Sequence, residues 1–450
     1  PQDVRLLREQ LDALRRSKAP RTAEVSNLIR RLQYRLDHYV QQPACRSIAD
    51  IAIVEATIAP DAQPGERELR LLTSRGPSNP LVFDVGQFPE TVRPPMKTMP
   101  KQVLGKEAAA LRQRPPEEEE VRVTPPCTMN GQIASREVNR YRFTARRGQR
   151  LVVALRARQL VPYIADAVPG WFQPVMAIHD ARGREVAFAD DYRFKPDPVI
   201  LFEPPEDGEY VLSIHDSIFR GREDFVYRVT IGQIPFVTLI FPLGCRVGES
   251  PSIAIEGWNI EGARIIMPPT GVAGRGWITA ICKRIHSNPM PFMVDTLPEL
   301  IENETSSPNV RRIRPPVIIN GRIGRPDEWD VYELVGRSNE VIVAEVIARR
   351  LDSPLDSMLK LTDSAGHLIA LNDDWEDLAS GWNTHHADSY IAARLPADGL
   401  YRVHIGDTAR KGGPEHAYRL RISPPRPDFE LRVVPSSAIA RGRDTFSVTV

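Results

Sequence analysis

The feature that most constrains this chain is a set of five short motifs that occurs twice in the same order. In both copies an Asp pair begins ten residues after the start of an Asp-x-x-Gly motif, and a Tyr-Arg pair begins twenty residues after an Asp-Gly pair. The motifs are Asn130-Gly131 and Asn320-Gly321, Asp180 to Gly183 and Asp363 to Gly366, Asp190-Asp191 and Asp373-Asp374, Asp207 to Tyr210 and Asp398 to Tyr401, and Tyr227-Arg228 and Tyr418-Arg419. The shared order and spacing indicate that 127–232 and 315–423 are two copies of one domain.

The composition indicates to which structural class the repeated domain belongs. A chain of 450 residues is too long for one ordinary core, and its 41 Pro and 28 Gly residues favour many turns over long helices. Short apolar alternations follow one another with turn residues between them, a pattern typical of β-sandwiches. The sequence therefore predicts an all-β chain of tandem β-sandwiches.

A second repeat marks a smaller module. Ser78-Asn79-Pro80 leads to Pro89-Glu90 as Ser287-Asn288-Pro289 leads to Pro298-Glu299, which indicates the closing strand of another domain type. We expect alternating modules in the following layout: 1–45, a helical hairpin insertion; 46–90, the C-terminal part of a small module; 91–126, a Pro- and Glu-rich linker; 127–232, the first large copy; 234–298, a complete small module; 299–423, the second large copy with its lead-in segment; and 428–450, the start of a further β module.

The helical hairpin is predicted from two apolar stripes at helical spacing. A break around Pro20 separates them. The stripes are Val4, Leu7, Leu11 and Leu14, and then Val25, Leu28, Ile29, Leu32, Leu36 and Tyr39. Charged residues fill the opposite faces, and we expect those faces to be solvated.

Charge and hydropathy exclude several classes of function. The formal charge is +1, with 59 basic and 58 acidic side chains, so nucleic acid is not an expected partner. No apolar stretch reaches the roughly 18 residues that a membrane-spanning helix needs. The chain starts at Pro1 without a leader and stops at Val450 within a strand-like alternation, so we expect a piece of a longer protein whose export signal lies upstream.

The four cysteines form no CxxC pair. Cys245 and Cys282 fall inside one module and could form a disulfide. The alternative is that all four cysteines are buried thiols.

The larger copies resemble the bacterial pre-peptidase C-terminal (PPC) domain, a jelly-roll-like β-sandwich of secreted proteins. The residues that carry this resemblance are Asn320-Gly321 to Tyr332, Asp363 to Gly366, Asn372 to Asp374, Pro396 to Tyr401 and Tyr418-Arg419. The module at 234–298 resembles immunoglobulin-like TIG domains through Ile240 to Gly244 and Ile253 to Gly257. The alternating layout is similar to that of large exported proteins of planctomycete-like bacteria. The resemblance implies secretion, attachment beside catalytic domains and, in some members, bound calcium.

A calcium site in the second copy follows from that resemblance. Calcium-binding members place acidic residues in the segment that leads into the sandwich and add Asp residues from its first loop. Here Ser306 and Ser307 replace an amide and an acid of that pattern, while four carboxylates remain: Glu302, Glu304, Asp327 and Asp330. The first copy has Glu137 and Asn139 at the loop and no acidic lead-in before Cys127, so we expect no site there.

A second cluster of polar residues comprises Asp373, Asp374, Asp377, His385, His386 and Asp388, matched in part by Asp190, Asp191 and Asp197 of the first copy. Adjacent Asp residues commonly accept hydrogen bonds from backbone amides in turns, which is the interpretation we favour. A metal bound by His385 and His386 is the alternative, and it requires a bent loop because adjacent strand residues point apart.

The sequence contains no HExxH, GxSxG or P-loop motif. We therefore predict a non-catalytic extracellular, cell-surface or periplasmic protein that acts as a scaffold, adhesion or surface-assembly component, with other protein modules or cell-surface components as partners. One alternative is an accessory region of a secreted hydrolase or peptidase. Another is a pair of carbohydrate-binding modules, since aromatic faces stack on sugars and four Trp residues lie near predicted loops: Trp171, Trp329, Trp375 and Trp382.

Overall fold

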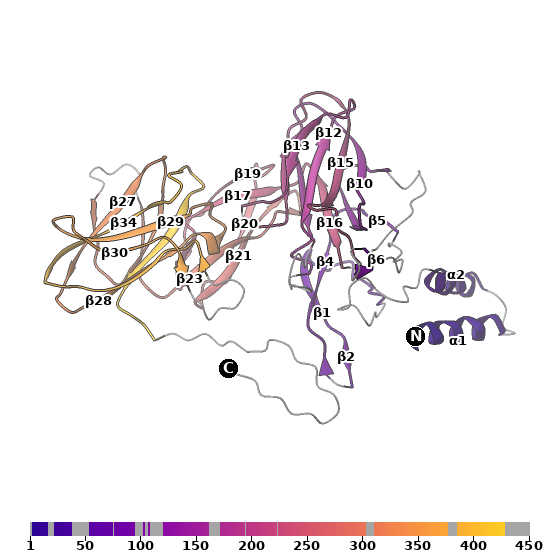
Figure 1. The fold of residues 1–450 in the computed structure, drawn as a ribbon, viewed down its shortest axis with the longest axis horizontal. Helices are drawn as coiled ribbons and strands as arrows, with labels where there is room; N and C mark the ends of the chain where they lie inside the picture. Colours follow the sequence, from indigo (N-terminus) through magenta and orange to yellow (C-terminus); the bar gives the residue numbers. More distant parts are fainter. Residues whose placement is uncertain are drawn as a thin grey trace. The chain divides into compact units, whose positions relative to one another are not determined.

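A computed structural model describes residues 2–16, 22–37, 54–74, 76–94, 102–103, 107–108, 120–161, 172–193, 195–222, 224–302, 310–376 and 385–427. The chain divides into two compact units, Pro1–Ile234 and Pro235–Val450. Strands are the predominant regular structure among the described residues, and the prediction of an all-β chain of tandem β-sandwiches is confirmed (Figure 1). No helix among these residues is long and apolar enough to cross a membrane.

The helical hairpin at the start of the first unit forms as its two stripes predict. Helix α1 (Gln2–Arg16) and helix α2 (Ala23–Asp37) each bury a leucine of their stripe, Leu11 and Leu32 respectively. The remainder of the N-terminal part is a set of short strands, namely β1 (Gly65–Leu69), β2 (Leu72–Thr73), β3 (Gly76–Pro77), β4 (Leu81–Val85), β6 (Gln102–Val103) and β7 (Glu107–Ala108), paired as β1 with β4, β2 with β3 and β6 with β7.

The first sandwich has two sheets of five strands. One sheet has the order β13-β12-β15-β10-β8 and the other β14-β11-β16-β9-β5. Their bounds are β5 (Glu90–Val92), β8 (Glu120–Arg122), β9 (Cys127–Gln132), β10 (Asn139–Ala145), β11 (Leu151–Arg156), β12 (Pro174–His179), β13 (Glu185–Ala189), β14 (Val199–Phe202), β15 (Gly208–Asp216) and β16 (Val226–Gly232). Strands β5 and β8 precede 127–232 in sequence, and each adds to one sheet in parallel.

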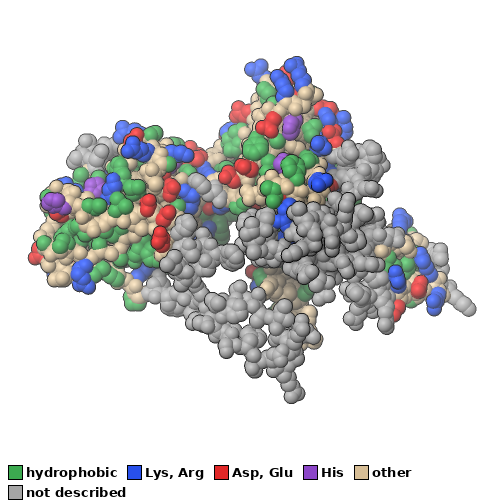
Figure 2. Space-filling view, viewed as in Figure 1, with side chains coloured by type: hydrophobic (Ala, Val, Ile, Leu, Met, Phe, Trp, Pro, Cys, Tyr) green, Lys and Arg blue, Asp and Glu red, His purple; other side chains and the backbone are tan. Residues whose placement is uncertain are grey.

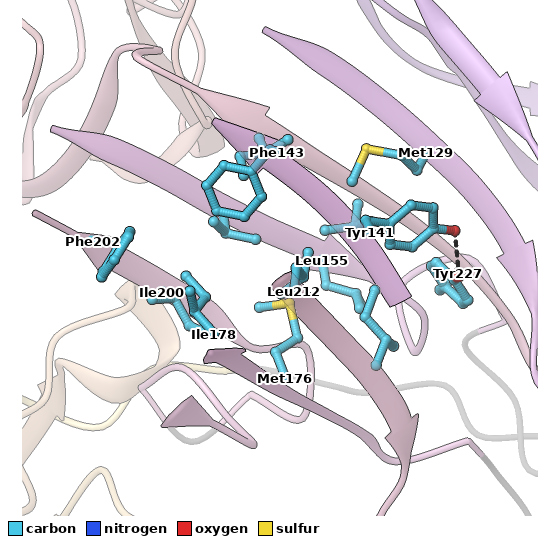
Figure 3. Packing of buried hydrophobic residues seen from close by; sticks show 14 of the residues in the cluster. Met129, Tyr141, Phe143, Leu155, Met176, Ile178, Ile200, Phe202, Leu212 and Tyr227 are labelled. Carbon is cyan, nitrogen blue, oxygen red and sulfur yellow. Dashed lines mark hydrogen bonds between the residues drawn. The ribbon is translucent and has the colours of Figure 1, made fainter. Parts of the chain in front are cut away.

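Alternating side chains from both sheets of the first sandwich meet in one core. Figure 3 shows Phe143, Met176, Ile200 and Leu212 pointing into it. The same figure shows the hydroxyls of Tyr141 and Tyr227 joined across the two sheets. A buried hydroxyl group must form a hydrogen bond, and here the two tyrosine hydroxyls bond to each other.

The second sandwich repeats this topology strand for strand. Its sheets have the orders β30-β29-β34-β27-β25 and β33-β28-β35-β26-β24. Their bounds are β24 (Glu299–Ile301), β25 (Val310–Arg312), β26 (Val317–Arg322), β27 (Trp329–Gly336), β28 (Val341–Ile347), β29 (Ser357–Asp363), β30 (Leu368–Asn372), β33 (Tyr390–Arg394), β34 (Gly399–Asp407) and β35 (Ala417–Ser423), with a short ribbon of β31 (Trp375–Glu376) and β32 (His385–His386) at one end. The repeat inferred from the motifs is confirmed by this shared order.

The equivalent tyrosines Tyr210 and Tyr401 show how closely the copies agree. The Tyr210 hydroxyl donates to the carbonyl of Glu206 at 2.7 Å, and that of Tyr401 donates to the carbonyl of Ala397 at 2.6 Å. In both cases the acceptor lies four residues upstream. The Asp-Gly-x-Tyr motif is therefore a turn fastened by its own tyrosine.

The small module lies between the sandwiches in sequence. Its strands are β17 (Phe236–Phe241), β18 (Gly244–Arg246), β19 (Ala254–Trp258), β20 (Arg264–Ile266), β21 (Gly274–Cys282), β22 (Ile285–His286) and β23 (Met290–Asp295). They form a ribbon of β17 and β19 and a sheet of order β18-β23-β21-β20, with β22 paired to β21. Its core includes Leu351 and Ala417 of the second sandwich, so within the second unit the two modules share buried side chains.

Candidate cation site

The end of the second sandwich that carries the lead-in strand β24 brings two acidic side chains together. Glu302 follows β24, and its backbone N–H donates to the carbonyl of Asn320 at 2.8 Å. Asp330 lies in β27. The hydroxyl of Tyr418 reaches both carboxylates, at 2.7 Å from Asp330 Oδ2 and 3.3 Å from Glu302 Oε2.

A buried tyrosine pair lies beneath the two carboxylates. The Tyr332 and Tyr418 hydroxyls are 2.7 Å apart. Gly321 makes room for the Tyr418 ring, because a Cβ at this position would lie 2.4 Å from the ring hydroxyl and 2.6 Å from Glu302 Oε2. The glycine of the Asn-Gly motif is therefore required by close packing against Tyr418 and Glu302.

Burial makes this pair of carboxylates costly when both are ionised. Desolvation, followed by the charge of Glu302, raises the pKa of Asp330 to about 8. The same two carboxylates add to burial in holding the pKa of Tyr332 and Tyr418 well above the usual value. The Arg311 guanidinium lies 3.9 Å from Glu302 Oε1. A cation placed between the carboxylates would offset this repulsion, and carboxylate oxygens are the ligands that calcium prefers.

The other two carboxylates of the expected calcium site are placed differently. Asp327 is exposed and lies 3.6 Å from the guanidinium of Arg410, which is also exposed. Glu304 lies outside the described residues. In the parts of the chain that the structure describes, no three His, Cys, Asp or Glu side chains are grouped so as to hold a metal ion. Among the described residues, two of the four carboxylates, those of Glu302 and Asp330, thus lie together.

Sequence reasoning missed the ion pair that fastens the lead-in strand. Both nitrogens of the Arg419 fork donate to Glu299, at 2.9 and 2.7 Å, and the side-chain amide of Asn320 donates to the same carboxylate at 2.8 Å. In the first sandwich Arg228 and Asn130 hold Glu90 in the same manner. The signal available in the sequence was the repeated Pro-Glu pair, which the repeat pattern alone assigns to the closing strand of the small module.

The second polar cluster is organised around Asp388, which is fully buried. Its carboxylate accepts backbone N–H groups from residues 348, 349 and 350 at 3.0, 2.7 and 3.2 Å, and Arg350 Nε donates to it at 2.7 Å. Asp197 of the first sandwich accepts three backbone N–H groups in the same turn. This turn-capping role is the one that the sequence favoured for the cluster, but it falls on Asp388.

The side chains of three other members of the cluster are described: His386, Asp373 and Asp374. The N–H of Asp388 donates to His386 Nδ1 at 3.2 Å, and burial, followed by the charge of Arg350, lowers the pKa of His386. Asp373 is exposed, and the carbonyl of Asp374 accepts from Asn372 at 2.7 Å. His385 lies in β32, but its side chain is outside the described residues, as is Asp377.

Two of the four loop tryptophans are described. The Trp329 ring lies against Gly406, where an added Cβ would come within 2.9 Å of it, and Lys360 Nζ lies 3.8 Å from its centroid. Trp375 packs edge-to-face on Tyr390 at 4.2 Å. Trp171 and Trp382 lie outside the described residues. Both described rings thus pack on groups of their own sandwich.

Three cysteines, Cys127, Cys245 and Cys282, are free thiols. Burial raises the pKa of each, and that of Cys127 reaches about 11. The suggested disulfide between Cys245 and Cys282 is therefore not formed in this structure. Cys45 lies outside the described residues.

Comparison with known proteins gives local likenesses. No family model matches the sequence. A probable subtilase-type serine protease of Deinococcus radiodurans is 36% identical over 100 residues, which cover 20% of this chain and 12% of that protein. The pre-peptidase C-terminal domain of a Bacillus anthracis collagenase is 17% identical, with a TM-score of 0.19, over 27% of this chain and all of that domain. A Clostridium perfringens structure of an M60 catalytic domain with two CBM51 domains is 9% identical, with a TM-score of 0.15, over 63% of this chain and 33% of that one. The chain thus spans a small part of the curated relative.

Proposed function

We propose that this chain is a non-catalytic region of an exported protein, in which alternating β-sandwiches act as a scaffold, adhesion or surface-assembly component. The main support for the proposal is that the repeated Asp residues form hydrogen bonds that hold turns of the fold. Asp180 and Asp363 each accept two backbone N–H groups of their own turn, and Asp197 and Asp388 each accept three. Because these repeated Asp residues stabilise turns, they support a structural role for both sandwiches.

Both large copies are assigned to the PPC-like class under this proposal, and the module at 234–298 to the immunoglobulin-like TIG class. The repeated motifs and the shared strand order support the first assignment. Two short apolar motifs support the second. Partners would be other protein modules or cell-surface components. On the face shown in Figure 2, acidic and basic side chains are interspersed over both units, which gives a polyanion no continuous basic surface among the described residues there.

An accessory region of a secreted hydrolase is the second candidate. The local identity with a protein named as a probable subtilase-type protease favours it. In that case the catalytic domain would belong to another part of the longer protein. The sequence of that protein separates the two candidates, because a hydrolase domain beside these modules would favour the accessory role.

Calcium binding by the second sandwich is a separate proposal. The half-buried pair of Glu302 and Asp330 supports it, since two carboxylates that share one hydroxyl favour a divalent counter-charge. Calcium would supply that charge, and Glu304 and Asp327 would have to approach the pair to complete the ligand set.

The test of the main proposal is an activity and binding screen of the chain of residues 1–450. We expect no hydrolysis of protein or glycan substrates. Turnover that a single substitution abolishes would contradict the non-catalytic role. Saturable binding in a glycan array, lost on changing Trp329 to Ala, would favour the carbohydrate-binding alternative.

A further inference from the structure

The two sandwiches carry opposite charges at one equivalent position. The lead-in strands β5 and β24 pair in parallel with β9 and β26 in the same register, which makes Arg93 the counterpart of Glu302. Their backbones agree as well. Arg93 N–H donates to the carbonyl of Asn130 at 2.9 Å, and Glu302 N–H donates to that of Asn320 at 2.8 Å. A cationic side chain in one copy therefore stands where the other copy has an anionic one.

The tyrosines and the glycine around this position are the same in both copies, but one neighbouring charge is not. Arg311 of β25 lies 3.9 Å from Glu302 Oε1 and takes the place that Val121 has in β8 of the first copy. Tyr141 and Tyr227 are hydrogen-bonded at 2.6 Å, as Tyr332 and Tyr418 are at 2.7 Å. Gly131, like Gly321, lies against the ring hydroxyl, at 2.4 Å from a would-be Cβ. The shared frame makes the difference in charge the informative feature.

A second charge changes with the first. Asn139 takes the place of Asp330, because Tyr141 and Tyr332 follow them two residues later in equivalent strands. Asn139 Nδ2 donates to the Tyr227 hydroxyl at 2.8 Å, whereas Asp330 accepts from the Tyr418 hydroxyl at 2.7 Å. The first sandwich thus has one built-in positive charge at this site, whereas the second has two acidic groups and only one guanidinium, that of Arg311, near them.

The Arg93 side chain is buried against this frame. Its guanidinium lies 4.7 Å from the centroid of the Tyr141 ring, and its Nη2 donates to the carbonyl of Arg140 at 2.6 Å. Arg140 precedes Tyr141 in β10, which belongs to the other sheet of the sandwich from the lead-in strand. The guanidinium therefore bridges the two sheets at the end where the lead-in strand joins.

We infer that Arg93 is a tethered cation that takes, in the first sandwich, the place that a divalent metal ion takes between Glu302 and Asp330 in the second. This inference rests on the calcium proposal for the second sandwich. It assigns the chain one calcium-dependent sandwich and one that carries its own positive charge. Docking of β24 would then respond to calcium, while docking of β5 would not.

Exchange of the two charge sets tests the inference in the whole chain. Amide hydrogen exchange of peptides that contain β5 and β24 is measured in millimolar calcium and in chelator, and calcium stoichiometry is measured by titration calorimetry. The wild type should bind one calcium ion, with protection rising at β24 alone. The variant Arg93→Glu/Asn139→Asp should bind two and gain protection at β5. The variant Glu302→Arg/Asp330→Asn should bind none.

Arg93→Met is the matched control, since it removes the charge of a side chain of similar length. It should speed exchange at β5 in both solutions, because calcium cannot replace the lost guanidinium without carboxylates. If Arg93→Glu/Asn139→Asp fails to fold in both solutions, the reverse variant decides. Persistent calcium binding by Glu302→Arg/Asp330→Asn would then contradict the inference.

The outcomes separate the two proposals. A wild type that binds no calcium and shows equal exchange at β24 in both solutions contradicts the calcium proposal and, with it, the inference. A second outcome contradicts the inference alone. In it, calcium slows hydrogen exchange at β24 of the wild type, but it does not change exchange at β5 of a well-folded Arg93→Glu/Asn139→Asp variant. Unchanged exchange at β5 in Arg93→Met also contradicts it.

Discussion

The lead-in ion pairs offer a prediction with an internal control. Changing Glu299 to Gln keeps the shape of the side chain but leaves the Arg419 guanidinium without its counter-charge. In the second sandwich the pair is nearly dry, with side chains 1% and 7% exposed for Arg419 and Glu299. In the first sandwich Glu90 is 35% exposed beside Arg228. Water can therefore take up part of the charge in the first pair only.

The expected costs follow from this difference in burial. Removal of one partner of a buried ion pair typically costs about 3–5 kcal/mol, whereas exposed pairs contribute about 0.2–1 kcal/mol. Glu299→Gln should thus lower the unfolding free energy of the second sandwich by about 3 kcal/mol. Glu90→Gln should lower that of the first by about 1 kcal/mol.

Native-state hydrogen exchange at increasing urea resolves the two sandwiches within the whole chain. Peptides from β26 and β35 report the second sandwich, and peptides from β9 and β16 report the first. Equal destabilisation by Glu299→Gln and Glu90→Gln, or a cost below about 0.5 kcal/mol for Glu299→Gln, would refute the reasoning from burial. Arg419→Lys serves as a further control, since it keeps the charge but not the two-pronged geometry.

Three other predictions follow from the same contacts. Calcium at a hundredfold excess over its Kd should stabilise the second sandwich by about 2.7 kcal/mol and raise its melting temperature by several degrees in calorimetry, an effect that Glu302→Ala/Asp330→Ala abolishes. In chelator, the urea midpoint of the second sandwich should fall as the pH rises from about 4 to about 8, because folded Asp330 holds a proton in that range. The unfolded chain has already released this proton, since an Asp carboxyl in water has a pKa of about 3.9. A midpoint independent of pH would contradict the raised pKa of Asp330 in the folded sandwich. Asp388→Ala should lower the unfolding free energy of the second sandwich by about 3 kcal/mol in urea denaturation, because three backbone N–H groups lose their acceptor. Asp197→Ala should have the same effect on the first sandwich.

The fold was predictable because its signals are local and occur twice. Each copy contains an Asp-x-x-Gly turn, an Asp-Gly-x-Tyr turn and alternating strands that can be recognised on their own. Because the same motifs occur twice in the same order, a chance match is excluded. The lead-in strands were harder to place. Strands β5 and β24 are three residues each, and they pair with strands that follow well after them in sequence, so no local periodicity reports them.

The candidate site was only partly predictable for a related reason. Glu302 and Asp330 were chosen because they matched a pattern of acidic residues, and their shared partner Tyr418 comes from a distant strand. Asp327 matched the same pattern, but its backbone has a positive φ of 63° and the side chain is exposed near Arg410. The direction of a side chain in a loop depends on such backbone angles, which spacing along the sequence does not specify.

Comparison of the two copies separates residues that hold the fold from residues free to differ. The turn aspartates, the lead-in ion pair and the tyrosine pair are kept in both, and each satisfies buried polar groups that any copy must satisfy. Arg93 and Glu302 differ although they occupy the same position beside the same tyrosines. A buried charge that changes sign beside the same tyrosines needs compensating changes. Two are present: Asn139 of the first copy corresponds to Asp330 of the second, and Val121 corresponds to Arg311. In the second sandwich, Arg311 lies near one of the two acidic groups, and a proton or a metal ion would offset the charge that remains. Under the calcium proposal, a calcium dependence of the second sandwich and an independence of the first would both follow from this exchange of charge.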